Sequence, residues 1–201
     1  MMKSQTLFLL LGVLFFGCEQ KKQALLGETD FQRELNSEFK DASKSPLKSK
    51  DRDKFKGLDF FTYDSTYVVE AEFKRTEGEK PFKMRTTTGL LPEYIKYGEI
   101  TFELENEAFT LNVYQNQELL NEEGFEDYLF LPFLDDTNGD ESYGGGRYID
   151  LRLPDGNHLT VDFNTAYNPY CAYNEKYSCP IVPRENYISV AVRAGVMNWE
   201  L

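Results

Sequence analysis

The first pattern along this chain is helical and covers only a short stretch near its start. Large apolar residues recur four apart and share one helix face: Phe31, Leu35 and Phe39. Thr29 and Gln32 have the spacing of a capping box at its beginning. The Ser45-Pro46 pair closes the segment, because a residue before proline avoids helical geometry. The pattern predicts one short helix, followed by a charged run from Lys48 to Lys54.

From Gly57 onward the period changes to two, which is typical of strands with one buried face. Runs of this alternation lie at 67–73, 99–104, 109–114, 149–153, 159–163 and 188–192. A denser apolar run at 128–134 predicts a central strand, although Pro132 favours an edge or a bulge. Short strands separated by turns predict an all-β fold, namely an antiparallel β-sandwich or partly open barrel preceded by the short N-terminal helix.

The first residues read as an export signal. Lys3 precedes an almost wholly apolar run from Leu7 to Phe16, which is too short to span a bilayer of roughly 30 Å. Gly17-Cys18 follows directly and resembles the lipobox of bacterial lipoproteins, although Phe15 stands where leucine is commonest. The resemblance implies a lipid on Cys18 that anchors the protein to a membrane of the bacterial cell envelope.

These patterns divide the chain of 201 residues into three parts. Residues 1–17 are the predicted lipoprotein signal peptide, 18–56 a tether with the short helix, and 57–201 one β-rich domain. The sequence does not say which membrane carries the anchor, or which face of it.

Charge is unevenly distributed. The whole chain has a formal net charge of −12. From Gly57 onward there are 26 acidic against 11 basic residues, a net charge of −15. Such a domain repels nucleic acid, so no nucleic-acid partner is expected. The charge suits either a plain soluble surface or a cationic partner.

Longer motifs identify the chain as similar to a known family. They read Tyr128-Leu-Phe-Leu-Pro-Phe133, Asp136-Thr-Asn-Gly139, Glu141-Ser-Tyr-Gly-Gly-Gly-Arg-Tyr148, Asp162-Phe-Asn-Thr-Ala-Tyr-Asn-Pro-Tyr-Cys-Ala-Tyr173 and Cys179-Pro180. This arrangement resembles domain-of-unknown-function family 1684 over nearly the whole predicted mature chain. Lipid-anchored members of this kind are typical of Bacteroidetes-like bacteria, and other relatives lack a leader. The resemblance implies one domain and supplies no substrate, cofactor or catalytic assignment.

The glycine-rich stretch from Asp135 to Tyr148 is the first candidate for chemistry. It lacks the Gly-Lys-Ser/Thr ending of a phosphate loop and the glutamate that would close an EF-hand loop. One interpretation is a ligand-binding loop in which Arg147 or Tyr148 binds a carboxylate, a phosphate or a sugar hydroxyl. The other is a tight turn with Arg147 paired to Glu141 or Asp150.

The second candidate is the loop from Asp162 to Cys179, which is rich in Asn and Tyr. Asp162, Asn164, Tyr167 and Asn168 are candidate pocket groups, since functional side chains often lie on such ordered loops. The alternative is a loop whose Asn side chains satisfy its own backbone.

Lipidation of Cys18 would leave two thiols, Cys171 and Cys179. In an exported protein, an even number of remaining cysteines favours a disulfide. Buried free thiols and a metal or catalytic role also stay open. The family resemblance implies that relatives without a leader carry both cysteines, which weakens the case for a disulfide. Two cysteines and one histidine, His158, supply too few ligands for a structural zinc, so no metal is predicted.

Two functions remain. The first is a non-catalytic, membrane-anchored module that binds a small polar ligand or supports the envelope, with Glu141, Arg147, Tyr148, Asp162, Asn164, Tyr167 and Asn168 as candidate ligand contacts. The second is a carboxylate-based hydrolase or lyase acting on a small molecule or sugar, with Asp162 or Glu141 as acid/base and Arg147 as anion clamp. The enzyme predicts that the two loops converge on one pocket that holds a carboxylate with a shifted pKa, whereas the binding module needs only a pocket without such a carboxylate or an aromatic surface patch. Neither identifies a cofactor or a protein partner.

Overall fold

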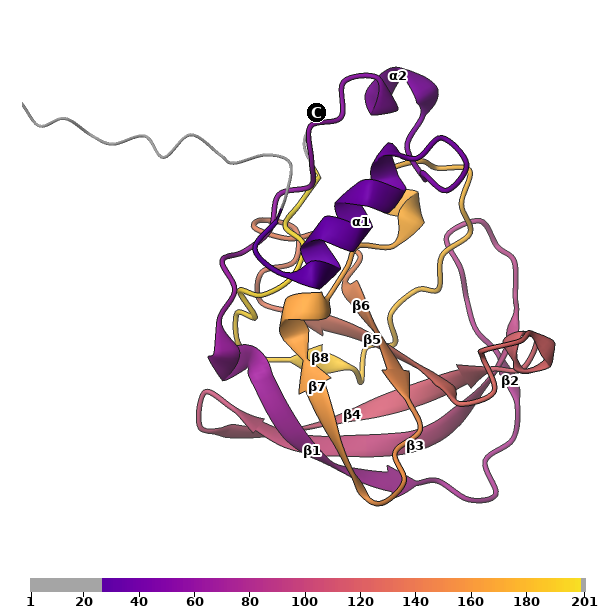
Figure 1. Cartoon of the computed structure of the whole chain (residues 1–201). Coiled ribbons are helices and arrows are strands. Elements are labelled where there is room, and N and C mark those ends of the chain that lie inside the picture. Colours follow the sequence, from indigo (N-terminus) through magenta and orange to yellow (C-terminus); the bar gives the residue numbers. More distant parts are fainter. Residues whose placement is uncertain (1–26, 200–201) are drawn as a thin grey trace, which may run out of the picture.

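The computed structural model describes residues 27–199 as a curled, mostly antiparallel half-barrel with two short helices at one end (Figure 1). The helices and strands are α1 (Asp30–Lys40), α2 (Ser49–Arg52), β1 (Val68–Arg75), β2 (Phe82–Lys83), β3 (Glu93–Leu104), β4 (Glu107–Asn116), β5 (Tyr128–Asp135), β6 (Arg147–Arg152), β7 (His158–Asp162) and β8 (Tyr187–Ile188). Single 3₁₀ turns occur at Ser65–Tyr67, Leu119–Asn121, Phe163–Thr165 and Tyr170–Ala172. The prediction of a partly open barrel after a short helix is confirmed.

The strand order in the sheet is β6-β5-β4-β3-β1-β7, and β2 adds to β3. The strands β6 and β7 are consecutive in the chain yet form opposite edges of the sheet, joined only by the bend at residues 153–157. The sheet must therefore curl to bring its edges near each other. β8 pairs with β5 in parallel, as the one exception to antiparallel pairing among the described strands.

Alternation places the main core inside the curl. In β1, Val69, Ala71 and Phe73 are buried while Glu70 and Glu72 are exposed. The same alternation fills the interior along β3 to β7, where the buried side chains include Phe102, Leu111, Leu129, Phe133 and Ile149, and Phe163 joins them from the 3₁₀ turn after β7. Burial of this apolar surface is the main force holding the sheet curled.

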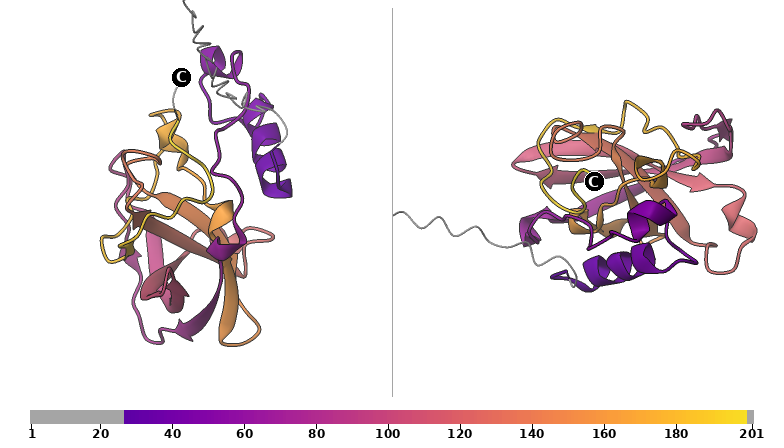
Figure 2. Two further views of the ribbon diagram at one scale, coloured as in Figure 1. Left: turned by 90° about the vertical axis from the view of Figure 1, so that its left-hand side faces the viewer. Right: turned by 90° about the horizontal axis from the view of Figure 1, so that it is seen from above.

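The N-terminal helix α1 follows its predicted signals. The Thr29 hydroxyl accepts a hydrogen bond from the Gln32 backbone N–H at 3.2 Å, which caps the helix start. The helix ends at Lys40, before the Ser45-Pro46 pair. It lies across one end of the half-barrel (Figure 2), where Phe39 is buried in a cluster with Leu47, Leu58, Tyr173 and Val196.

The last predicted strand is wrong over most of its length. Instead of spanning residues 188–192, the strand β8 covers only Tyr187–Ile188. The backbone beyond it leaves the ladder because its polar groups bond to side chains: Val192 N–H donates to Asp135 Oδ1 at 3.2 Å, and Arg147 donates to Val192 O at 2.7 Å. Side-chain partners of this kind compete with strand pairing. Sequence alternation also missed β2 and the first half of β3.

Candidate functional site

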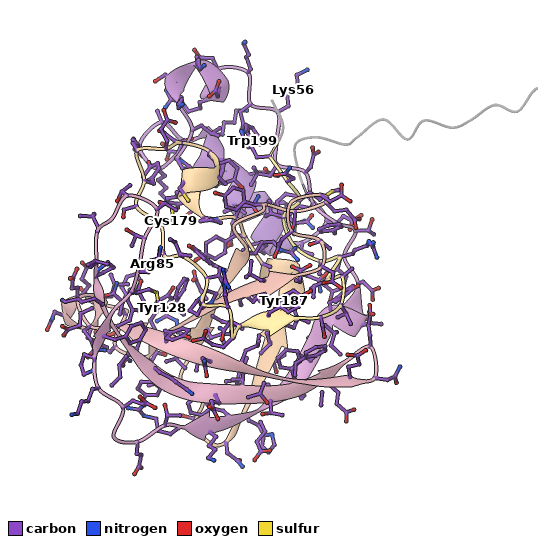
Figure 3. All side chains as sticks on the ribbon, turned by 180° about the vertical axis from the view of Figure 1, so that it is seen from behind. Lys56, Arg85, Tyr128, Cys179, Tyr187 and Trp199 are labelled. Carbon is purple, nitrogen blue, oxygen red and sulfur yellow. The ribbon has the colours of Figure 1, made fainter. Side chains whose placement is uncertain are left out.

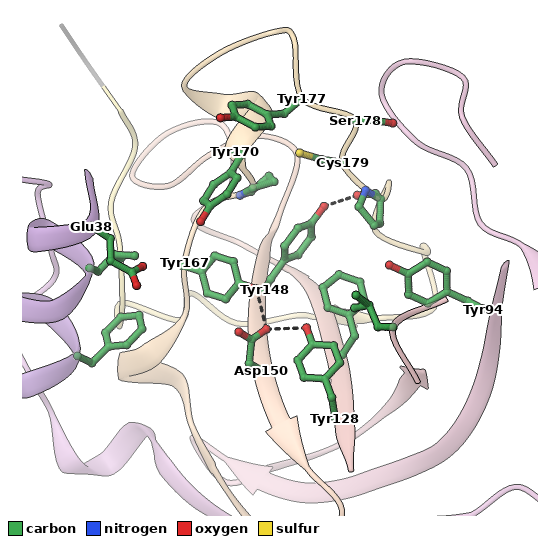
Figure 4. A pocket seen from close by; sticks show the side chains of 16 residues that line it. Glu38, Tyr94, Tyr128, Tyr148, Asp150, Tyr167, Tyr170, Tyr177, Ser178 and Cys179 are labelled. Carbon is green, nitrogen blue, oxygen red and sulfur yellow. Dashed lines mark hydrogen bonds between the residues drawn. The ribbon is translucent and has the colours of Figure 1, made fainter. Parts of the chain in front are cut away.

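A cavity of about 410 Å³ lies between α1, the outer face of β5 and β6, and the loop around residues 167–180 (Figure 4). Its lining is dominated by aromatic rings: Phe31, Tyr94, Tyr128, Phe130, Tyr148, Tyr167, Tyr170 and Tyr177. The remaining lining residues are Leu35, Glu38, Leu119, Asp150, Pro169, Ser178, Cys179 and Pro180. The volume is in the range of small-molecule sites, roughly 300–1,000 Å³.

Strand alternation produces the floor of the cavity. In β5, Leu129 and Leu131 face the main core, so Tyr128 and Phe130 face the opposite side. In β6, Ile149 and Leu151 face the core, so Tyr148 and Asp150 face outward. Phe130 and Asp150 are direct cross-strand partners. The outward face is thus a second, aromatic layer rather than a polar surface.

The loop wall is attached to this floor by backbone pairing. Tyr148 and Tyr167 exchange two backbone hydrogen bonds of 2.9 and 3.0 Å, which add the start of the loop to the edge of β6. Their rings meet edge to face, 5.8 Å apart and at 90°. Tyr148 also meets Phe130 edge to face at 4.7 Å. These contacts hold three rings in fixed and different orientations.

Asp150 is the polar centre of the floor. Its Oδ1 accepts hydrogen bonds from the hydroxyls of Tyr128 at 2.8 Å and of Tyr167 at 2.7 Å (Figure 4). Burial, followed by the charge of Asp150, raises the pKa of Tyr128 and of Tyr167 well above the ordinary tyrosine value. Both phenols therefore stay protonated donors at any physiological pH.

Tyr148 and Tyr170 complete the row of phenols. The Tyr148 hydroxyl donates to the backbone carbonyl of Pro180, and burial raises its pKa far above the ordinary value. The pKa of Tyr170 is also raised, by burial first and then by the charges of Glu38 and other neighbours including Asp150. Glu38 reaches the cavity from α1, so the helix contributes a wall rather than only a tether.

The two cysteines lie together at the upper wall. Cys179 lines the cavity, and its Sγ accepts a hydrogen bond from the Cys171 backbone N–H at 3.1 Å. Seen from behind, Cys179 and Tyr128 lie on the same side of the molecule, with Tyr187 on the other (Figure 3). Both cysteines are free thiols in this structure. The predicted disulfide stays a prediction about the oxidised protein.

The thiols differ in their acidity. The Cys179 thiol donates toward Cys171 and lowers the pKa of Cys171 to about 6, with a smaller contribution from the Tyr143 hydroxyl, 4.0 Å away. The same hydrogen bond, followed by burial, raises the pKa of Cys179. One sulfur is thus a thiolate acceptor near neutral pH and the other its donor.

Two candidates from the glycine-rich stretch do not reach the cavity. The Arg147 side chain is fully buried, where it pairs with Asp135 at 2.8 Å, and Glu141 forms an exposed ion pair of 2.7 Å with Arg193. A ligand could not contact Arg147 without displacing its partners. The predicted turn in which Arg147 pairs with Glu141 or Asp150 is also wrong, since its partner is Asp135.

Three candidates from the second loop have structural partners instead. Asp162 caps a 3₁₀ turn by accepting from the Asn164 backbone N–H at 2.9 Å. Asn164 exchanges two hydrogen bonds with the backbone of Asp64, and Asn168 donates to Met197 O at 2.9 Å. This fits the alternative in which Asn side chains satisfy loop and neighbouring backbone. Of the seven ligand candidates, the cavity receives only Tyr148 and Tyr167.

Sequence reasoning missed the residues that complete the cavity. The alternation placed Asp150, Tyr128 and Phe130 in strands but gave no role to the strand face that points away from the core. The signal was present, because a strand whose outward positions read Tyr128, Phe130 and Pro132 has two apolar faces. Those outward residues predict a second covering layer rather than solvent.

Two negative observations concern the described part of the chain alone. Between residues 27 and 199, no helix is both long and apolar enough to cross a membrane. Nor do three or more His, Cys, Asp or Glu side chains gather there in a way that could hold a metal ion. Cys18 and its predicted lipid lie outside the described residues.

Comparisons with known proteins agree with the resemblance seen in the motifs. A sequence family described as "Protein of unknown function (DUF1684)" matches residues 53–197. The chain is similar to an uncharacterized protein of Haloarcula marismortui solved by solution NMR, with 34% sequence identity and a TM-score of 0.65. The similarity covers 83% of this chain and 89% of that one. No curated protein matches the chain.

Proposed function

Since this chain belongs to the DUF1684 family of proteins of unknown function, whose description assigns no activity, we propose a function from the cavity. The protein is a membrane-anchored, non-catalytic module that binds a small ligand between α1, the β5–β6 floor and the loop around residues 167–180. The observation that carries this proposal is the aromatic cavity of about 410 Å³ with a hydrogen-bonded carboxylate on its floor.

The construction of the walls supports binding. Rings buried against one another lose little freedom when a ligand arrives, so less of the binding free energy is spent on ordering side chains. Tyr128, Tyr148 and Tyr167 each hold a hydrogen bond that fixes the orientation of the ring. A surface this apolar, left open to water, is also costly to a protein unless something covers it.

Binding is favoured over a carboxylate-based hydrolase or lyase by where the acids lie. The two residues that such an enzyme was predicted to use, Asp162 and Glu141, have partners outside the cavity. The anion clamp, Arg147, is buried in an ion pair of its own. The cavity has two carboxylates of its own, Asp150 and Glu38, but the described residues that line it include no arginine or lysine to act as the clamp of that mechanism.

A thermal-shift screen tests the binding proposal. The full chain, kept in a nonionic sugar-headgroup detergent, is heated with amines, sugars, nucleotides and carboxylic acids in turn. A ligand at about 100 times its Kd adds roughly 2.7 kcal/mol, which raises the Tm of a protein of this size by about 5–10 °C. Absence of any binder to the folded chain would overturn the proposal.

A matched pair of variants locates the site. Leu119 lines the cavity and its neighbour Leu120 is not among the lining residues. Leu119→Trp fills part of the cavity, so the shift produced by a binder should disappear. Leu120→Trp should retain it. If both variants keep the full shift, the ligand binds elsewhere and the cavity assignment is wrong.

The anchor is tested separately, because it rests on the leader and not on the described residues. Cells expressing the chain are labelled with a fatty acid and fractionated. Cys18→Ser should lose the label and leave the membrane fraction, since the lipid supplies the membrane affinity. Cys171→Ser is the control and should keep both. A Cys18→Ser protein that stays labelled would contradict the anchor.

A further inference from the structure

Three of the six tyrosine hydroxyls that line the cavity already donate to acceptors of the protein. Tyr128 and Tyr167 both donate to Asp150, and Tyr148 donates to the carbonyl of Pro180. A phenol has one proton to give, so these three are committed. Around Tyr128, Tyr148 and Tyr167 the cavity therefore presents ring faces and acceptors, and the other phenols of its lining are those of Tyr94, Tyr170 and Tyr177.

Charge at the cavity is negative. Asp150 and Glu38 are its two charged lining residues, and the described residues that line it include no lysine, arginine or histidine. Both hydrogen bonds to Asp150 end on Oδ1, and the residue is exposed, so its Oδ2 is available to a ligand. An anionic ligand would be repelled here, and the wider domain, with its net charge of −15, repels it further.

The field of these carboxylates extends across the rings. Glu38 on the helical wall and Asp150 on the floor both contribute to the raised pKa of Tyr170, after the effect of burial. Tyr170 meets Tyr177 at 5.3 Å and 63°, near the rim. The Lys176 ammonium already lies 4.8 Å from the centre of the Tyr177 ring, so this rim attracts a cation from the chain itself.

Neighbouring aromatic rings of the cavity stand at steep angles to one another. Tyr148 stands at 90° to Tyr167 and at 74° to Phe130, so neighbouring rings present faces in different directions. Eight aromatic side chains line this one space, and the ring faces turned toward it would attract a cation through their negative quadrupoles, as an aromatic cage does. A carboxylate at the floor of the cage adds a counter-charge. A bare metal ion fits less well, because it needs more oxygen ligands than two separated carboxylates provide.

We infer that the ligand of this cavity is an organic cation, a quaternary or alkylated ammonium group carried on an apolar body. The ammonium lies against Asp150 and the surrounding ring faces, while the body fills the space toward Phe31 and Leu35 of α1. This inference rests on the proposed function and specifies its ligand class.

Titration calorimetry with isosteric pairs tests the ligand class. The probes are choline and benzyltrimethylammonium, each paired with the neutral molecule in which a carbon atom replaces the quaternary nitrogen. Shape is the same within a pair, so any difference in affinity reports charge. We expect at least one cation to bind about tenfold or more tightly than its neutral partner, a difference of about 1.4 kcal/mol.

Variants assign the charge recognition to the floor. Asp150→Asn keeps the size of the side chain and should weaken cation binding about tenfold, leaving the neutral partner unchanged. Asp155→Asn removes an equal charge from an exposed bend outside the cavity and should change neither affinity. Tyr167→Phe keeps the ring and removes one donor to Asp150, so the cation should still bind.

The outcomes separate the two proposals. Equal binding of cation and neutral partner, or binding of another ligand class with no cation bound, overturns the organic-cation inference and leaves the cavity as a binding site. If the folded chain binds no ligand of any class, both the proposed binding function and the organic-cation inference are overturned. Cation binding that Asp150→Asn and Asp155→Asn weaken equally shows a general charge effect and also overturns the inference.

Discussion

The guanidinium of Arg147 and the carboxylate of Asp135 form an ion pair of 2.8 Å in which both side chains are completely buried. Arg147 also donates to the carbonyls of Val192 and Ala194, and Asp135 accepts from the backbone N–H of Thr137 and Val192. The pair therefore ties the C-terminal segment to β5 and β6. It explains why a residue that reads as an anion clamp is structural.

Removing Arg147 should be severely destabilising. Arg147→Met keeps most of the side-chain volume but leaves Asp135 buried without its cation, which costs about 3–5 kcal/mol. Urea unfolding followed by tyrosine fluorescence measures the loss. Arg193→Met is the control: its pair with Glu141 has 57% and 32% of the two side chains exposed, so the loss should stay below about 1 kcal/mol. Equal losses would refute the structural role of Arg147.

Much of the fold could be predicted from period alone. The helix at Phe31–Phe39 and the alternation of β1, β4 and β7 depend on the local spacing of hydrophobic residues, which can be read directly from the sequence. The strand at 188–192 could not be predicted in this way. Its backbone is diverted by Asp135 and Arg147, which lie more than 40 residues earlier in the chain.

The candidate site was predicted only in part, for a similar reason. Tyr148 and Tyr167 were identified because unusual loops contain them, and backbone pairing does bring them together. Arg147 and Asn164 share those loops but point to other partners, and spacing carries no information on direction. Asp150 was missed because a single acid in an alternating strand is usually a solvated position.

Asn186 should be as important to stability as a core residue. It is fully buried, donates to Asn112 O at 2.8 Å and to Pro132 O at 2.7 Å, and accepts from the Asn112 N–H at 2.9 Å. It thus joins β4 to β5 where the two strands share a single register pair. Asn186→Ala leaves buried backbone groups without partners and should cost about 2–4 kcal/mol.

Chemical denaturation of Asn186→Ala beside Asn121→Ala checks this expectation. Asn121 is exposed, so its replacement should change the free energy of unfolding by less than about 0.5 kcal/mol. A loss at Asn186 as small as that at Asn121 would mean that the bridge between β4 and β5 contributes little.

Phe39 tests whether α1 belongs to the domain or to the tether. Its ring is 2% exposed and meets Tyr173 edge to face at 4.7 Å. Phe39→Ala should cost about 3–5 kcal/mol and should loosen the helical wall of the cavity. Phe82→Ala, at a site 38% exposed, should cost well under half as much. Thermal unfolding of both variants measures the difference. A negligible loss of stability in Phe39→Ala would mean that residues 30–40 belong to the tether and not to the domain.

Cys171 should react as a thiolate at neutral pH. Its pKa is lowered to about 6, chiefly by the thiol of Cys179, so its rate of alkylation by iodoacetamide should rise with a midpoint near pH 6. An ordinary cysteine has its midpoint near about 8.5. Because the folded pKa lies below the unfolded one, this group contributes stability that is fully present above the unfolded pKa. That contribution is lost as the pH falls through about 6.

Two variants and one reductant make the result decisive. Cys179→Ala removes the donor and should move the Cys171 midpoint up toward the ordinary value, whereas Tyr143→Phe, which removes a more distant hydroxyl, should move it less. The labelled residue is identified by peptide mass spectrometry, with and without reductant. Labelling of Cys171 without reductant supports the thiol pair. Labelling of both residues only after reduction would instead establish the disulfide, closing a loop of seven intervening residues and adding about 2–3 kcal/mol to stability.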